Sequence, residues 1–111
     1  PRQAHELLGR EDTIFVDIRE AGELERDGRI PGAKAAPRGL LEFWIDPESP
    51  YHRPMFSSGK TFVFFCAAGW RSALATKAAQ DMGLSPVKHI EGGFGAWKDA
   101  GLPVEPGKPK V

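Results

Sequence analysis

The single cysteine of this 111-residue chain, Cys66, lies where an apolar run ends and a helical pattern begins. A thiol reacts as its thiolate, and free cysteine has a pKa of about 8.5. A position before a helix lowers that pKa, because unpaired N–H groups and the positive end of the helix dipole favour an anion. Nucleophilic chemistry is therefore favoured at this corner of the chain.

The residues that follow Cys66 could form a cradle for an anion. Residues 67–71 read AAGWR. A turn this short can direct its N–H groups around the sulfur as an anion-binding nest, and Gly69 can adopt positive φ without steric cost. Arg71 adds a permanent positive charge whose forked guanidinium suits a tetrahedral oxyanion. The pattern predicts a nucleophilic thiolate that faces an anionic substrate, and it does not require a histidine base.

Simpler interpretations of the same residues stay open. An unpaired cysteine at the end of a strand can be a small buried hydrophobe. Arg71 can pair with a carboxylate such as Asp17 or Glu91. A Cys–His protease arrangement has little support, because none of the three histidines lies in a recognisable protease signature. His52 stands in a long loop from which it could still reach the site.

Apolar runs predict the strands that position this corner. TIFVDI (residues 13–18) and TFVFF (61–65) are nearly continuous runs with β-branched and aromatic residues, typical of strands buried on both faces of a parallel sheet. VKHI (87–90) predicts a further strand, and RIPGAKAAP (29–37) predicts a turn with at most a very short strand. Cys66 directly follows a strand, and open α/β sheets bind ligands beyond the carboxyl ends of their strands.

Helical patterns alternate with the strands. The clearest runs over residues 72–82, where Ala75 and Met82 share the apolar face. Leu74 lies beside that face, and Thr76 falls on the opposite side. Shorter helices are predicted over residues 4–9, 19–28, 39–44 and 92–101, and the proline-rich segment 46–60 is predicted to be a loop.

Length and composition bound the class of protein. The chain is 41% apolar and 27% charged, an ordinary balance for one globular domain. Its net charge of zero gives no indication of binding to nucleic acid or to an anionic membrane. No apolar stretch approaches the roughly 20 residues that span a bilayer. A lone cysteine cannot form an internal disulfide, and no cluster has zinc spacing, so a reducing, cytoplasmic compartment without a metal is expected. The alternation of strands and helices predicts an α/β fold with a mostly parallel sheet.

Four segments resemble signatures of the single-domain rhodaneses, a family of sulfurtransferases. FVDIRE (residues 15–20) is similar to the first-strand signature of the family. GRIPGA (28–33) is similar to its G-H-I-P-G-A turn, with Arg29 where histidine is usual. CAAGWR (66–71) resembles the six-residue active-site loop, and EGGFGAW (91–97) resembles the C-terminal signature. The four segments occur in the order that the family has.

The resemblance covers nearly the whole chain, from about residue 3 to residue 104. It implies a three-layer fold in which helices flank a mostly parallel central sheet. It also implies one rhodanese domain over residues 1–111, with residues 105–111 expected to be a frayed tail. Structural roles are expected for other signature residues: Asp17, Arg19, Glu20, Pro31, Gly32, Phe94 and Trp97.

The resemblance further implies a two-step ping-pong transfer of sulfur. Catalytic Cys66 would attack the outer sulfur of a donor such as thiosulfate and release sulfite. The Cys66 persulfide would then pass its sulfur to an acceptor such as cyanide, a thiol or a protein, with no metal or organic cofactor. Arg71 would orient the anionic donor. The residues implied in substrate binding, mainly through their backbone N–H groups, are Ala67, Ala68, Gly69, Trp70, Arg71 and Ser72.

Two loop residues depart from the pattern of the family. Ala67 stands where many members carry a basic residue, which removes one charge from the mouth of the site and weakens the expectation that thiosulfate is the donor. Trp70 is bulky where small or polar residues are common. It could wall the entrance, dock a protein acceptor or pack on the long loop.

Two other functions stay open. A phosphatase or arsenate reductase could share the fold, but thiolate phosphatases place one residue more between cysteine and arginine than the four that separate Cys66 from Arg71. The shorter loop makes a narrower cradle, which argues against phosphate. A rhodanese-like binding module without catalysis often lacks the cysteine, which this chain keeps. The sequence therefore favours a sulfurtransferase.

Overall fold

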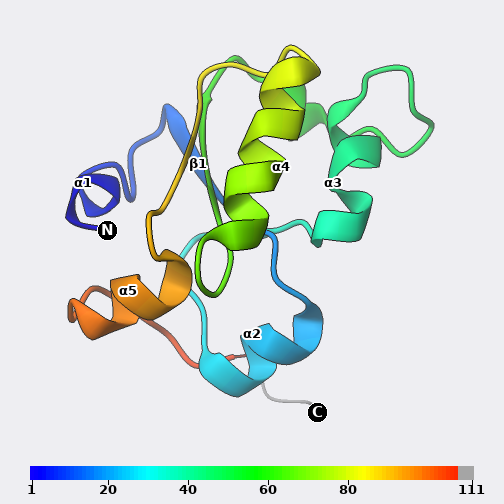
Figure 1. Cartoon of the computed structure of the whole chain (residues 1–111). Helices are drawn as coiled ribbons and strands as arrows, with labels where there is room; N and C mark the ends of the chain where they lie inside the picture. The colour runs from blue at the N-terminus through cyan, green and yellow to red at the C-terminus, as the bar shows by residue number, and fades with distance from the viewer. Residues whose placement is uncertain (108–111) are drawn as a thin grey trace.

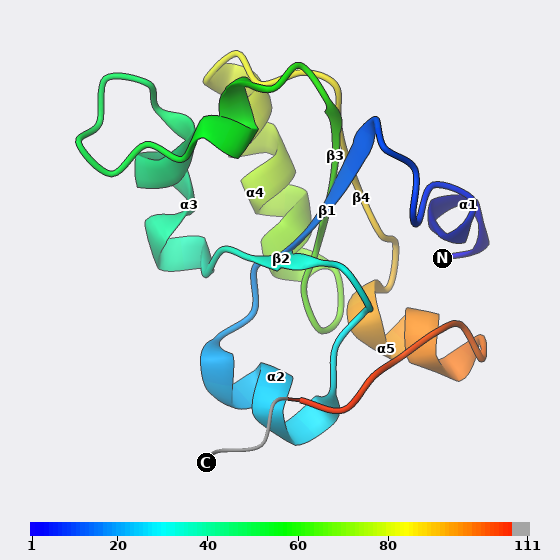
Figure 2. The same cartoon turned by 180° about the vertical axis from the view of Figure 1, so that it is seen from behind.

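The computed structural model of the chain describes residues 1–107 as a parallel sheet with helices on both faces (Figures 1 and 2). The strands lie in the order β2-β1-β3-β4, and every pair is parallel. They are β1 (Thr13–Asp17), β2 (Lys34–Ala35), β3 (Thr61–Phe65) and β4 (Val87–His89). The helices are α1 (Arg2–His5), α2 (Ala21–Asp27), α3 (Arg38–Ile45), α4 (Trp70–Asp81) and α5 (Gly93–Asp99), with a short 3-10 helix η1 (Pro54–Ser57). The predicted α/β fold is confirmed.

The central strands are buried on both faces, as their unbroken apolar sequences predict. Side chains alternate along a strand, so Phe62 and Phe64 of β3 enter one core and Val63 and Phe65 enter the other. The first core packs under α3 and α4, and the second packs against α1 and α5, on the opposite side of the sheet (Figure 1). Three layers result, and the sheet holds both cores together.

Helix α4 differs from its prediction in two ways. It begins at Trp70, two residues earlier than expected, because Gly69 with φ of 99° ends the preceding turn and caps the helix. Its buried face includes Thr76, whereas Leu74 is 69% exposed. The prediction was wrong because small side chains, rather than the largest apolar ones, let α4 approach the sheet closely.

The structure differs from the prediction at both ends of the described chain. Helix α1 ends at His5, and the chain then turns through residues 6–9 instead of continuing as a helix. The tail expected to fray from residue 105 is bound at its first residue, because Glu105 pairs with Arg29 through backbone hydrogen bonds of 2.9 and 2.8 Å. Such a pairing between distant residues leaves no local signal in the sequence. Residues 108–111 of the predicted tail lie outside the described residues.

A buried ion pair fixes the chain where β1 ends. The Arg19 guanidinium donates to both carboxylate oxygens of Asp17, the shortest bond being 2.7 Å, and to the carbonyl of Gly28 at 2.8 Å. It also lies 4.1 Å from the ring centre of Phe94. Both charged side chains are buried, so the pair joins β1, the end of α2 and α5 in the interior. The structural role predicted for Asp17 and Arg19 agrees with this buried ion pair.

Within residues 1–107, no helix is both long enough and apolar enough to cross a membrane.

Candidate active site

Cys66 lies at the carboxyl end of β3, where the chain turns into α4. Residues 67–69 make the turn, so three residues rather than five separate the cysteine from the helix. Figure 1 shows this turn beside α2 and α5, at the end of the sheet where the carboxyl ends of the strands meet. Trp70 and Arg71, which the sequence placed in the loop, form the first turn of the helix.

The sulfur of Cys66 is enclosed and hydrogen-bonded. The residue is 1% exposed, and its Sγ accepts the backbone N–H of Gly69 at 3.2 Å and that of Ser72 at 3.4 Å. The Ser72 hydroxyl lies 3.7 Å from the sulfur. Burial raises the pKa of the Cys66 thiol, but the bonds from Ser72, Gly69 and Ala68 together outweigh it, so that the pKa lies below its usual value. The cradle therefore stabilises a thiolate.

Helix α5 holds the cysteine loop from behind. The backbone N–H of Phe94 donates to the carbonyl of Cys66 at 2.7 Å, and that of Gly95 donates to the carbonyl of Ala67 at 3.0 Å. Gly93, with φ of 64°, packs so closely that a Cβ there would lie 2.8 Å from the carbonyl oxygen of Ala67. Gly93 and Gly95 of the EGGFGAW segment thus support the backbone of the loop. Phe94 and Trp97 are buried in the core, as predicted.

The guanidinium of Arg71 is held by a carboxylate from α2. Its two terminal nitrogens donate to the carboxylate oxygens of Glu23 at 2.7 and 2.8 Å. This bidentate pair lowers the pKa of Glu23 to about 2 and raises the pKa of Arg71 above its usual value. The alternative partners suggested by the sequence, Asp17 and Glu91, were wrong. Arg71 still brings a positive charge to the first turn of α4, next to Ser72.

A histidine that sequence reasoning left without a role reaches the site. His89 at the end of β4 has its Nδ1 3.4 Å from the Ser72 hydroxyl. His52, which the long loop could have carried to the site, instead contacts the hydroxyl of Ser57 through Nε2 at 2.9 Å. The signal was present in the strand period, because His89 lies two residues after Val87, whose side chain faces the core under α4.

The remaining loop side chains are small or point outward. Trp70 is 82% exposed, so it does not pack on the long loop, and packing on that loop was one of the alternatives that the sequence left open.

Arg38, at the start of α3, forms an ion pair with Glu42 on the same helix. Among residues 1–107, no group of three or more histidine, cysteine, aspartate or glutamate side chains is arranged to hold a metal ion.

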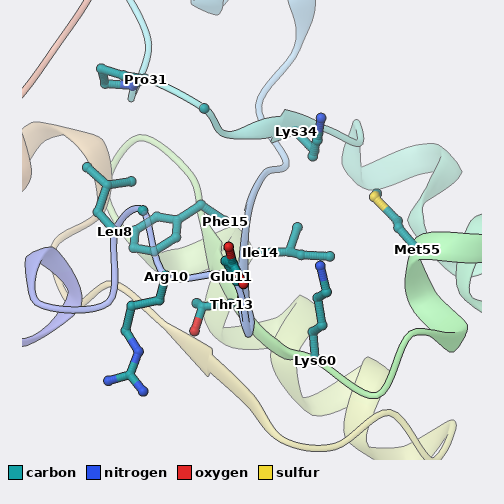
Figure 3. A pocket seen from close by; sticks show the side chains of 12 residues that line it. Leu8, Arg10, Glu11, Thr13, Ile14, Phe15, Pro31, Lys34, Met55 and Lys60 are labelled. Atoms are coloured by element: carbon teal, nitrogen blue, oxygen red, sulfur yellow. The ribbon is translucent and has the colours of Figure 1, made fainter.

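A cavity of about 740 Å³ lies at the other end of the sheet (Figure 3). Thr13, the first residue of β1, and Lys60, which directly precedes β3, are among its lining residues. Figure 3 shows Lys34 and Lys60 on two of its sides, with Ile14 between them. Because Cys66 follows the end of β3, this cavity is separate from the cysteine loop, and none of the predicted site residues lines it.

The Rhodanese-like domain family matches residues 1–100, and the chain therefore belongs to that family. Among its relatives, an uncharacterized protein of Synechocystis is 33% identical over 93% of this chain. A mouse protein named thiosulfate sulfurtransferase/rhodanese-like domain-containing protein 3 is 30% identical over 86% of it. The chain spans 52% and 64% of the lengths of these two relatives. The thiosulfate sulfurtransferase GlpE of Pseudoalteromonas translucida is 29% identical, and 85% of its length is covered.

Solved structures agree on the fold. A Rhodopseudomonas palustris protein of unknown function, named a possible tyrosine phosphatase, is 63% identical and superposes with a TM-score of 0.88 over 92% of this chain and 77% of that one. A thiosulfate sulfurtransferase from Pseudomonas aeruginosa is 25% identical, with a TM-score of 0.77 over 96% of this chain and 19% of that one. The predicted rhodanese-like architecture is confirmed, and the predicted membership of the family with it.

Proposed function

We propose that this domain is a sulfurtransferase that carries sulfane sulfur as a Cys66 persulfide. The observation that carries the proposal is the pair of backbone N–H groups, from Gly69 and Ser72, that point at the enclosed Cys66 sulfur. Preorganised N–H donors stabilise a thiolate and, after loading, a terminal persulfide sulfur that bears negative charge. The sulfurtransferases among the relatives support the same chemistry.

The proposed reaction has two half-reactions. Thiolate Cys66 attacks the outer sulfur of a donor such as thiosulfate, the sulfur–sulfur bond of the donor breaks, and sulfite leaves with the bonding electron pair. A nucleophile such as cyanide or a thiol then attacks the outer sulfur of the persulfide and regenerates the thiolate. No electron is gained or lost overall, so the chain's own residues suffice for the cycle. A reducing compartment such as the cytoplasm would keep Cys66 available.

The loop residues have distinct proposed roles. Ala67, Ala68 and Gly69 supply backbone around the sulfur, and their small side chains leave the mouth open. Arg71 contributes positive charge that attracts an anionic donor, although its forked donors are occupied by Glu23. Exposed Trp70 offers an apolar surface beside the mouth, suited to an acceptor that is itself a protein.

Arg71 also bears on the phosphatase alternative that the name of the 63%-identical neighbour raises. A thiolate phosphatase uses a guanidinium fork on the phosphate oxygens, and here two N–H donors of Arg71 are bonded to Glu23 instead. We therefore favour sulfur over phosphate as the transferred group.

Steady-state kinetics test this proposal. Purified protein is given thiosulfate and cyanide, and thiocyanate is measured over a grid of both concentrations, with p-nitrophenyl phosphate assayed in parallel. We expect parallel double-reciprocal lines, no phosphatase turnover, and loss of thiocyanate formation in Cys66→Ser. Turnover of the phosphate ester without thiocyanate would contradict the proposal. In a second series a protein persulfide replaces thiosulfate as the sulfur donor. This series is needed because Ala67, in place of a basic residue, weakens the expectation that thiosulfate is the donor.

A further inference from the structure

We infer that His89 accepts the proton of the Cys66 thiol through the Ser72 hydroxyl, so that Cys66, Ser72 and His89 form one relay. The inference deepens the proposed function, on which it rests for the role of Cys66 as nucleophile. It starts from a need of the site, because the thiol must lose its proton before it can attack, and its sulfur is enclosed.

The contacts form a continuous path from the sulfur to solvent. The Cys66 thiol lies 3.7 Å from the Ser72 oxygen, and that oxygen lies 3.4 Å from Nδ1 of His89. Ser72 is fully buried, whereas His89 is exposed. The serine hydroxyl is therefore an internal link, and the imidazole is the end of the path that can exchange protons with water. Distances of this length are common in unliganded sites and shorten when a substrate is bound.

The proton transfer balances without any further reactant. The S–H bond of Cys66 breaks and its proton passes to the Ser72 oxygen, while the Ser72 hydroxyl proton passes to Nδ1 of His89. One proton has moved from sulfur to nitrogen, and a thiolate and an imidazolium result. The neutral histidine must carry its hydrogen on Nε2 for this, which leaves Nδ1 free to accept.

The same contacts explain how the imidazolium holds the thiolate. The Ser72 hydroxyl has one hydrogen and several acceptors within reach, since the carbonyl of Gly69 lies 3.2 Å away. Once Nδ1 of His89 donates to the serine oxygen, the serine hydrogen is directed to the sulfur instead. His89 thus acts through Ser72, as a positioning residue, and Ser72 is the group that touches the reacting atom.

Charged groups lie near His89 on three elements. On α4 the charged neighbour of Ser72 is Arg71, whose fork is bonded to Glu23. Along its own chain Lys88 and Glu91 flank it, with opposite charges. On the side of α1, Glu6 lines a cavity that His89 also lines. None of these side chains has a hydrogen bond to the imidazole among the described residues, so Ser72 is the contact through which His89 reaches the site.

The test measures thiolate formation directly. Because Cys66 is the single cysteine, the ultraviolet absorbance of the thiolate reports this residue alone, after the signal of Cys66→Ser is subtracted. The pH titration is recorded for wild type, His89→Asn, Ser72→Ala and the double variant. His52→Asn serves as the matched histidine control.

We expect His89→Asn to move the thiolate midpoint upward by about one pH unit, so that the thiolate fraction below the midpoint falls about tenfold. His52→Asn should titrate like wild type. In the Ser72→Ala background, His89→Asn should add no further shift, because the link between the two groups is gone. A wild-type titration for His89→Asn, or an equal shift in both backgrounds, would overturn the relay.

Two features keep the test decisive. Thermal unfolding is measured for each variant, and His89→Gln replaces His89→Asn if the latter does not fold. The titration needs no sulfur donor, so failure of the relay leaves the sulfurtransferase proposal standing. Conversely, failure to form thiocyanate leaves the titration interpretable.

Discussion

At the scale of single residues, the site depends on backbone N–H groups more than on side chains. Gly69 and Ser72 point their N–H groups at the Cys66 sulfur, while Gly93 lets α5 approach the carbonyls of the same loop. A loop of alanine and glycine can therefore lower the pKa of a buried thiol through its backbone, without a basic side chain at Ala67.

Gly93→Ala tests this dependence. A Cβ at residue 93 would overlap the backbone of Cys66 and Ala67, and φ of 64° disfavours any side chain. We expect the variant to lose most thiocyanate formation and to unfold at lower urea, by at least about 1–2 kcal/mol for the left-handed backbone alone. Gly39→Ala is the control, since a Cβ there meets open space. Wild-type activity in Gly93→Ala would contradict the proposed support by α5.

At the scale of elements, the cysteine loop is held between three helices. It leads into α4, α5 bonds its carbonyls, and α2 reaches its arginine through Glu23. The Glu23–Arg71 pair joins α2 to α4, and no pattern in the sequence predicted that these two helices meet. Its contribution depends on pH, because the bond from Arg71 holds the pKa of Glu23 at about 2.

Glu23→Gln should therefore destabilise the protein in a pH-dependent way. A carboxylate whose folded pKa is lowered stabilises the fold above its unfolded pKa, and that stabilisation is lost as the pH falls from about 4.3 towards 2. With Arg71 39% exposed, solvent screening limits the loss at neutral pH to about 1 kcal/mol. Urea unfolding at neutral and at acid pH measures it. An equal loss at both pH values would show that the ion pair is not the cause.

The sequence predicted the elements better than their junctions. Continuous apolar runs identified β1 and β3, because burial on both faces leaves a strong local pattern. The start of α4 was misplaced, because a helix that begins at an exposed Trp70 carries no apolar or capping signal there. The strand period indicated only the face on which His89 lies, and its contact with Ser72 depends on the packing of α4 against β4. The pairing of Glu105 with Arg29 joins distant segments and left no local pattern.

At the scale of the whole molecule, one sheet separates two cores. A buried ion pair stabilises the end of the sheet at which the cysteine loop lies. Asp17 and Arg19 join β1 to the end of α2 and to Phe94 on α5. Helix α5 in turn donates hydrogen bonds to the cysteine loop. Removal of one partner leaves the other charge buried without compensation. Loss of this pair is therefore expected to destabilise β1, α2 and α5 together, in one cooperative unfolding transition.

Asp17→Asn should lower the free energy of unfolding by about 3–5 kcal/mol. The control is Asp12→Asn, which breaks an exposed pair with Arg10 and should change stability little. Urea unfolding, followed by both circular dichroism and tryptophan fluorescence, should give one coincident transition in each protein. A loss at Asp17 no larger than that at Asp12 would contradict the structural role of the buried pair.

The central claim is that Cys66 carries sulfur, and intact mass spectrometry tests it most directly. The protein is incubated with thiosulfate, and in a second arm with a protein persulfide, before its mass is measured with and without cyanide. We predict one added sulfur, about 32 Da, that is absent in Cys66→Ser and is removed by cyanide or a reducing thiol. No adduct from either donor, in protein shown to be folded, would contradict the claim and leave a non-catalytic rhodanese-like binding domain as the better description.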